Sequence, residues 1–144
     1  MAYNRCVGTR YCSNNCPFKV RRFNFFDYTS TITDPQRLVF NPEVTVRPRG
    51  VMEKCSFCIQ RIEDVKLRSN VEGRAIRDGE IKPACAVACP AQAIVFGDLH
   101  DPQSKVSKMS KQNRGYRMLE ELGIRPSVTY LTDISNPVAG KGKS

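Results

Sequence analysis

The chain has 144 residues, of which 40% are hydrophobic, with nine prolines, no tryptophan and a formal net charge of +9. This composition predicts a modest, loop-rich core that something besides apolar burial helps to stabilise. The sequence contains no run of eighteen apolar residues and no nucleic-acid recognition motif, and its basic residues are dispersed, so neither a membrane span nor a dedicated nucleic-acid surface is predicted.

The first cysteine group reads Cys6-Val-Gly-Thr-Arg-Tyr-Cys12-Ser-Asn-Asn-Cys16-Pro17. It follows the iron-sulfur ligand pattern C-x2-C-x2-C-x3-C-P, with Thr9 at the second cysteine position. In that pattern the first three cysteines hold one cluster and the fourth ligates a neighbouring one, so Cys6 and Cys12 should share a centre while Cys16 serves another. Because Thr9 offers no thiolate, the centre on Cys6 and Cys12 is expected to be 3Fe-4S.

The segment after Pro17 is rich in aromatic and basic residues. Residues 18–28 are predicted to be extended, with Phe23, Phe25 and Phe26 either packing near the clusters or forming a plain core strand. Prolines 35, 42 and 48 indicate that 31–49 is a loop, in which 43–47 is predicted to be a short strand.

The second cysteine group consists of Cys55-Ser-Phe-Cys58 and, after twenty-six residues, Cys85-Ala-Val-Ala-Cys89-Pro90. The same pattern assigns Cys55, Cys58 and Cys85 to a 4Fe-4S cluster and Cys89 to another. Both groups end in Cys-Pro after a three-residue gap and precede an extended segment, here 93–96, which indicates an internal repeat. Polar side chains beside the ligands are candidate hydrogen-bond donors to the cluster sulfurs: Ser13, Asn14, Asn15 and Ser56.

The clearest helix is predicted over 56–68, inside the insertion between Cys58 and Cys85, because apolar residues recur there at helical spacing. Residues 70–82 should form a surface turn or a partner contact. A helical turn is expected over 104–109, a helix over 116–122 that ends at Gly123, and a strand over 127–131. His100 is expected to be a solvated loop residue.

Other cysteine chemistries explain less of the pattern. A four-thiolate zinc site on Cys55, Cys58, Cys85 and Cys89 fits the spacing, but it leaves the first group and both Cys-Pro pairs unexplained. Seven cysteines cannot all pair in disulfides. A catalytic cysteine would need a base partner, and the chain contains a single histidine, His100. Thiolate-ligated iron-sulfur centres are net anionic, so they also account for the cationic scaffold.

The sequence resembles the four-cluster iron-sulfur subunits of molybdopterin oxidoreductases, and within them most closely the iron-sulfur protein of alternative complex III. The resemblance covers nearly the whole chain. It rests on residues 4–8, 16–19, 41–47, 50–58, 83–85 and 89–98, and for alternative complex III on 8–16 and 115–131.

The resemblance implies that this chain carries the third and fourth of four cysteine motifs. Three 4Fe-4S clusters and one 3Fe-4S cluster require fifteen thiolates, the number that seven cysteines and two further four-cysteine motifs supply. No cluster would then be completed by this chain alone. Cys16 and Cys89 would each finish a 4Fe-4S cluster of an absent motif, and residue 1 is expected to be internal to a longer protein, or another chain to supply the remaining cysteines.

The resemblance also implies an α+β, ferredoxin-like fold. Residues 1–99 would be the cluster-binding region, 100–135 a C-terminal helix and strand extension, and 136–144 a flexible basic tail. The expected function is to relay electrons from a quinol-binding integral membrane subunit to a haem c or other acceptor subunit of a respiratory complex, with no catalytic site in this chain. The alternative is the electron-transfer subunit of an active molybdopterin reductase such as polysulfide reductase. The implied location is peripheral, on the periplasmic side of the membrane.

Overall fold

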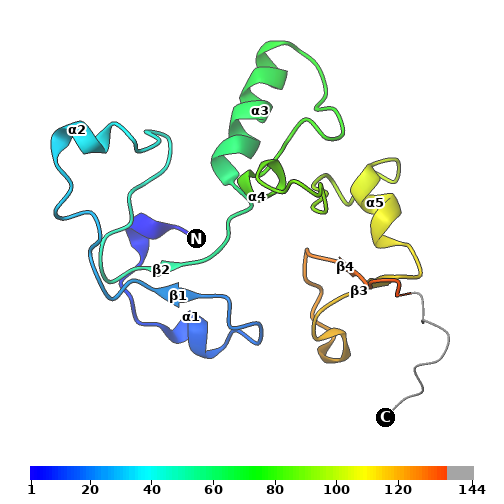
Figure 1. Ribbon diagram of the computed structural model, residues 1–144, viewed down its shortest axis with the longest axis horizontal. Helices are drawn as coiled ribbons and strands as arrows, with labels where there is room; N and C mark the ends of the chain where they lie inside the picture. Colours follow the sequence, from blue (N-terminus) through cyan, green and yellow to red (C-terminus); the bar gives the residue numbers. More distant parts are fainter. Residues whose placement is uncertain (136–144) are drawn as a thin grey trace. The chain divides into compact units, whose positions relative to one another are not determined.

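The computed structural model describes residues 1–135, and the predicted basic tail at 136–144 lies outside them. The chain divides into two compact units, Met1–Ile94 and Val95–Ser144. Both consist of short helices and two-residue strands joined by long loops, which confirms the predicted α+β class (Figure 1). The limits predicted for the cluster-binding region, 1–99, stay a prediction.

The first unit is organised around one short antiparallel pair. Strand β1 (Arg22–Phe23) pairs with β2 (Met52–Glu53), and the ladder continues where the Asn24 N–H donates to the Val51 carbonyl at 2.9 Å. Val51 and Met52 are the buried hydrophobic residues of the described chain, 6% and 2% exposed. The core of this unit is therefore the strand pair itself.

Two predictions for this region are wrong. No strand forms over 43–47, because the Asn41 side chain accepts the Glu43 N–H at 2.9 Å and turns the chain; the second strand lies later, at β2. A core-strand role for the aromatic residues also fails, since Phe25 and Phe26 are 61% and 67% exposed. Phe23 alone is partly buried, and its ring meets that of Phe25 edge to face at 4.8 Å.

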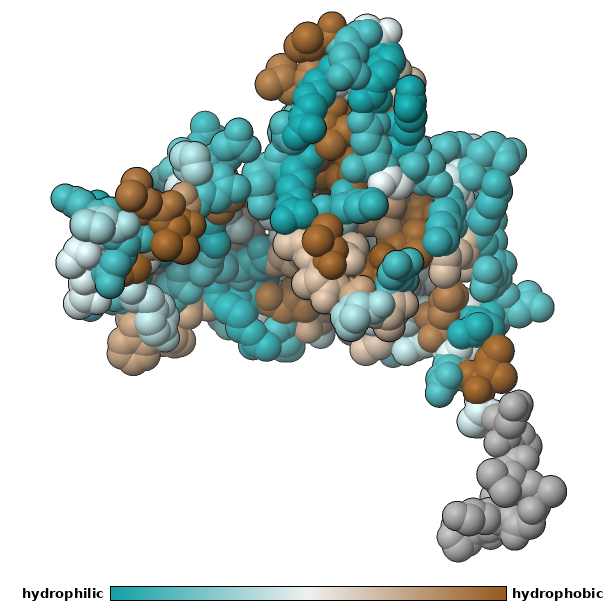
Figure 2. Space-filling view, turned by 45° about the horizontal axis from the view of Figure 1, so that its top comes forward, coloured by the Kyte–Doolittle hydropathy of each residue, from teal (hydrophilic) through white to brown (hydrophobic). Residues whose placement is uncertain are grey.

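The loop at 31–49 carries a short helix that was not predicted. Helix α2 (Asp34–Arg37) starts at a capping box in which Thr33 and Gln36 exchange side-chain and backbone hydrogen bonds. Pro35, near the start of this helix, suits a position where an N–H would lack a partner. The residues that follow, Leu38 and Val39, are 87% and 86% exposed, and apolar side chains appear among hydrophilic ones on the surface in Figure 2.

Helix α3 (Ile59–Val71) is the longest, and it begins three residues later than predicted. Phe57 and Cys58 have φ of 57° and 54°, a conformation that a right-handed helix cannot include. At the other end Gly73, with φ of 63°, follows the helix, and the Arg74 N–H donates to the Ser69 carbonyl at 3.0 Å. No helix of residues 1–135 has the length and apolar character needed to cross a membrane.

In the second unit, helix α5 (Lys105–Ser110) contacts a small strand pair. Ser104 caps the helix and is 1% exposed, and its hydroxyl donates to the Asp98 carbonyl at 2.6 Å. Strand β3 (Gly115–Tyr116) pairs with β4 (Tyr130–Leu131), within the predicted 127–131. The predicted helix over 116–122 is wrong: only a 3-10 turn, η2 (Glu120–Leu122), forms there, because Leu119 has φ of 56°. The predicted end at Gly123 is confirmed.

Candidate iron-sulfur ligand loops

All seven cysteines lie in the first unit, as free thiols on loops or short helices. Two are exposed, Cys55 and Cys85, and the other five are partly exposed. Within residues 1–135 no three Cys, His, Asp or Glu side chains come together as a group that could hold one metal ion. The set predicted for one cluster, Cys55, Cys58 and Cys85, is thus not gathered around one point, and its role stays a prediction.

Cys6 is hydrogen-bonded to Met52, the buried residue of strand β2. It follows the short 3-10 helix η1 (Tyr3–Arg5), and its Sγ accepts the Met52 N–H at 3.3 Å. The chain then passes close to the neighbouring loop at Gly8, where φ is +72° and a Cβ would lie 2.2 Å from the Gly50 carbonyl oxygen. Only glycine allows this approach, which sets the course of the chain between Cys6 and Cys12.

Replacing Gly8 with alanine is therefore expected to destabilise the first cysteine loop strongly. Gly79→Ala is a matched control, because Gly79 has a similar φ of +78° but nothing within 4 Å of the place that a Cβ would occupy. The left-handed conformation alone costs about 1–2 kcal/mol, and the clash with backbone adds about 1–3 kcal/mol. Thermal unfolding of both variants measures the difference in stability. Equal losses of stability would show that the close approach of Gly8 to Gly50 does not contribute to the effect.

Cys12 and Cys16 lie on a helical turn and on the Cys-Pro turn that follows it. Helix α1 (Tyr11–Asn14) begins after Arg10, which has φ of 62° and whose guanidinium lies 5.2 Å from the centre of the Phe23 ring. Hydrogen bonds from backbone N–H groups, that of Val20 first, lower the pKa of the Cys16 thiol below its ordinary value, although burial raises it. The turn therefore favours a thiolate at Cys16.

The same backbone geometry recurs at the second Cys-Pro pair. Helix α4 (Ala84–Val87) begins one residue before Cys85, as α1 begins one residue before Cys12. Each Cys-Pro turn closes at its fourth residue: the Lys19 N–H donates to the Cys16 carbonyl at 3.2 Å, and the Gln92 N–H to that of Cys89 at 3.1 Å. Lys19 and Gln92 have φ of 51° and 50°. This agreement in detail supports the internal repeat inferred from the spacing.

The turn between Cys55 and Cys58 directs backbone donors at sulfur. The Phe57 N–H donates to Cys55 Sγ at 3.4 Å, and Phe57 and Cys58 both take left-handed conformations. Such a conformation is unusual for a residue as bulky as phenylalanine and marks positions where the surroundings fix the backbone. Cys58 then stands directly before helix α3.

Cys58 and Cys85, separated by twenty-six residues in sequence, are linked through one backbone group. The Ala84 N–H, at the first position of α4, donates to Cys58 Sγ at 3.3 Å. Pro83 before it is buried, with ψ of 157°. The end of the insertion thus returns to its start, and the residue directly before Cys85 contacts the sulfur of Cys58.

Ala84→Pro removes the N–H that donates to Cys58 Sγ and leaves the cysteine itself unchanged. Proline suits the first position of a helix, and the extended Pro83 is already compatible with a following proline. Since hydrogen bonds to sulfur raise the reduction potential of a cluster, we expect the midpoint potential of the cluster predicted on Cys58 to fall by on the order of tens of millivolts. Redox titration followed by EPR measures it. Ala84→Ser, which keeps the N–H, should leave the potential unchanged; a proline variant with the same potential would contradict the argument.

The donor set fits iron-sulfur chemistry. Thiolates are the soft ligands that these clusters require, and hydrogen bonds to their sulfurs are one of the ways in which a protein tunes them. Backbone N–H groups donate to the sulfurs of Cys6, Cys55, Cys58 and Cys89, the last from Ala93 at 3.4 Å. The loops thus present sulfurs toward which backbone donors are already directed.

Two of the polar side chains that the sequence suggested as sulfur donors bond to backbone instead. Ser13 donates to the Arg10 carbonyl at 2.7 Å and Asn15 to the Tyr11 carbonyl at 3.3 Å, so both brace α1. The donors to sulfur are main-chain groups, which have no sequence signal beyond the cysteine spacing itself. His100 is 99% exposed beside Asp98, as expected for a solvated residue.

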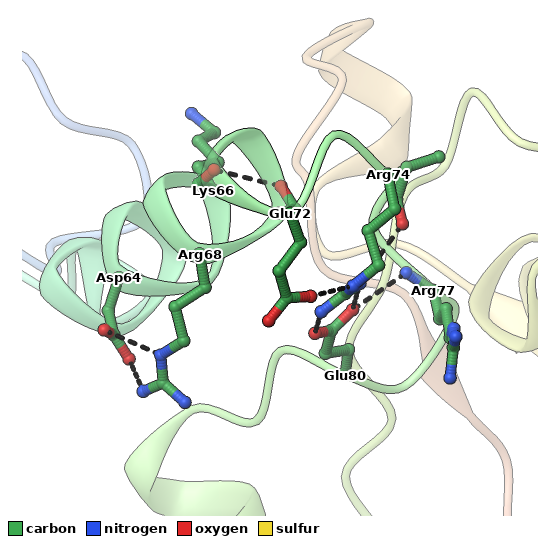
Figure 3. A network of polar contacts seen from close by, with 9 residues as sticks. Asp64, Lys66, Arg68, Glu72, Arg74, Arg77 and Glu80 are labelled. Carbon is green, nitrogen blue, oxygen red and sulfur yellow. Dashed lines mark hydrogen bonds and ion pairs between the residues drawn. The ribbon is translucent and has the colours of Figure 1, made fainter.

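The far end of the insertion is held by charged side chains (Figure 3). Arg74 pairs with Glu80 through two hydrogen bonds of 2.9 and 2.5 Å and also pairs with Glu72, and Glu80 accepts the Arg77 N–H at 3.0 Å. The hydrogen bond from Arg74 holds the pKa of Glu80 at about 2. Both side chains of the Arg74–Glu80 pair are only about a quarter exposed, at 27% and 25%.

Because of the Arg74–Glu80 pair, we expect the 72–80 turn to open in a pH-dependent way. Because the pKa of Glu80 is lowered from 4.5 to about 2, its contribution to stability is complete above pH 4.5 and is lost as the pH falls through 2. Glu80→Gln should reduce protection of the Arg77 amide in hydrogen exchange at neutral pH and flatten its change between pH 5 and about 2. Glu63→Gln, which removes an exposed pair with Lys66, is the control. Identical profiles for Glu80→Gln and the unmodified protein would refute the expectation.

Comparison with known proteins gives a consistent family context. No protein-family model matches the chain. The chain is 44% identical over 133 residues to the iron-sulfur cluster-binding subunit of menaquinone reductase from Nitratidesulfovibrio vulgaris, covering 90% of this chain and 51% of that protein. It is 37% identical over 131 residues to an Hdr-like menaquinol oxidoreductase iron-sulfur subunit from Archaeoglobus fulgidus, covering 88% and 43%.

A third relative is the B subunit of polysulfide reductase from Wolinella succinogenes, 32% identical over 123 residues, covering 85% of this chain and 46% of that protein. In each of these matches the chain spans about half of the relative's length. Nine-tenths of the chain aligns with the first of them. The chain is therefore a homologue of iron-sulfur subunits of menaquinone-linked and polysulfide-reductase-type oxidoreductases.

Proposed function

We propose that this chain is the cluster-bearing part of an electron-transfer protein of a quinol-oxidising respiratory complex, of the alternative complex III type. The observation that carries the proposal is the direction of backbone N–H groups toward cysteine sulfurs in both halves of the repeat, at Cys6 and Cys58 for example. Such donors stabilise thiolates and tune cluster potentials. When bound, the clusters would supply one-electron carriers; the chain would hold, orient and insulate them.

The proposed ligand sets follow the two cysteine groups. Cys6 and Cys12 would hold a 3Fe-4S cluster, and Cys55, Cys58 and Cys85 a 4Fe-4S cluster. Cys16 and Cys89 would each complete a further 4Fe-4S cluster whose other ligands lie outside this chain. In support, Cys55 and Cys85 are exposed and so are open to a complementary polypeptide.

Two kinds of partner follow from the proposal. A quinol-binding integral membrane subunit would deliver electrons, and a haem c or other acceptor subunit would receive them, with the protein held at the periplasmic face of the membrane. Relatives named for menaquinone and menaquinol support the quinol side. The second candidate function, electron transfer to an active molybdopterin reductase, is supported by the relative named for polysulfide reductase and by another, the iron-sulfur subunit of arsenate respiratory reductase from a Shewanella species.

The test uses the protein purified from its own cells with its bound subunits. Iron, acid-labile sulfide, zinc and molybdenum are quantified, and EPR spectra are recorded before and after addition of a reduced menaquinone analogue. Iron and sulfide in near-equal amounts, with cluster signals that the quinol reduces, are expected. Molybdenum in the complex would favour the second candidate, whereas zinc without labile sulfide would overturn both.

A further inference from the structure

Helix α3 carries the chain away from Cys58, and its partner ligand Cys85 follows only after the chain has returned. Thirteen residues of helix extend about 20 Å, and residues 72–84 must cover that distance in the opposite direction. Figure 1 shows this out-and-back course between α3 and α4. How precisely Cys85 is placed beside Cys58 depends on what joins the returning segment to the helix.

One side chain makes that join at the end where the cysteines lie. Arg61, on the first turn of α3, donates from Nη1 to the Lys82 carbonyl at 3.1 Å. Its own backbone N–H donates to the Cys58 carbonyl at 2.8 Å. Arg61 is thus bonded by its main chain to the residue before the helix and by its side chain to the segment that returns.

The contacts that follow Lys82 depend on this connection. Pro83 is buried and extended, so the chain from the Lys82 carbonyl to the Ala84 N–H has little freedom. The Ala84 N–H then meets Cys58 Sγ at 3.3 Å, and Cys85 is the next residue. The Arg74–Glu80 pair closes only the opposite end of the insertion, near the C-terminus of α3.

We propose that Arg61 is a positioning residue for the Cys58–Cys85 ligand pair, and this inference rests on the proposed cluster-binding function. By holding the Lys82 carbonyl, the guanidinium fixes the position of the Ala84 N–H, which donates to Cys58 Sγ and belongs to the first residue of α4. Arginine suits this task because it is charged at every physiological pH and offers several N–H donors from one planar group.

A matched set of variants tests the role in the purified native complex. Arg61→Gln removes the charge and shortens the reach, Arg61→Lys keeps the charge, and Arg68→Gln removes an arginine from the same helix that pairs with Asp64 instead of the returning segment. The readouts are the rate of iron release to a chelator, the EPR line shape of the individual clusters, and their midpoint potentials.

We expect Arg61→Gln to release iron about threefold to tenfold faster, the range that corresponds to the net contribution of one ordinary hydrogen bond. One cluster should change line shape and shift to lower potential. Arg61→Lys keeps the positive charge, so its midpoint potential should lie between those of Arg61→Gln and the unmodified protein. If the Arg61→Gln protein fails to accumulate in cells, the Arg61→Lys protein should still do so. Arg68→Gln should have the iron release rate, line shapes and potentials of the unmodified protein. Clusters that are present but unaltered in both Arg61 variants would overturn this inference alone, and a native protein without iron and labile sulfide would overturn the proposed function with it.

Discussion

Replacing Thr9 with cysteine is expected to convert the 3Fe-4S centre proposed on Cys6 and Cys12 into a 4Fe-4S centre. Thr9 occupies the second cysteine position of the ligand pattern, and a thiolate there can hold the iron that a threonine hydroxyl leaves without a soft ligand. The side chain is exposed, and Thr9 is not among the residues of positive φ, so cysteine meets no backbone strain. Iron per molecule should rise by about one.

The measurement is the EPR signal of the oxidised 3Fe-4S centre, which Thr9→Cys should remove while a 4Fe-4S signal appears on reduction. Thr9→Ser is the matched control, because it keeps a hydroxyl at the same position and should keep the 3Fe-4S signal. The potential of this one centre should change, while the clusters on the second cysteine group keep theirs. An unmodified protein with only 4Fe-4S signals would contradict the ligand assignment at Thr9.

The sequence was most informative where chemistry and spacing coincide. The two Cys-x3-Cys-Pro segments predicted a repeat, and the structure repeats the helix before Cys16 and Cys89 and the turn after each. The helix in the insertion was predictable from its apolar spacing, but its start was not. Ligand-loop geometry overrode helix propensity at Phe57 and Cys58, which lie in left-handed conformations.

The rest depended on contacts between residues distant in sequence. Strand β2 has only two residues, which is too short for a recognisable alternating pattern in the sequence. Its Met52 N–H donates to Cys6, forty-six positions away, so no local pattern predicts that hydrogen bond either. The contact of Arg61 with the Lys82 carbonyl is hidden for the same reason, because any residue offers a carbonyl. The start of helix α2 is different: its capping box pairs Thr33 with Gln36 three positions later, a local pattern that the sequence itself contains.

The last prediction concerns the chain produced alone: residues 1–144 are expected to hold less than about a tenth of the iron that the native protein holds. Metal sites rarely preform without all their ligands, and no three candidate ligands converge within residues 1–135. Apolar burial offers little compensation, since Val51 and Met52 are the buried hydrophobic residues described while Phe26 and Leu38 are 67% and 87% exposed. The product should also aggregate or be degraded, because so much apolar surface lacks cover.

Production together with a polypeptide that carries the complementary cysteine motifs should restore both iron content and solubility. A variant with all seven cysteines replaced by serine sets the background for iron bound adventitiously. If the shared-ligand arrangement holds, Cys16→Ser and Cys89→Ser in the joint product should each remove a cluster whose other thiolates lie on the complementary polypeptide, and leave the centre nearest in sequence intact. Stoichiometric, stable clusters in residues 1–144 alone would refute the shared arrangement, because each centre would then find its full ligand set within one chain.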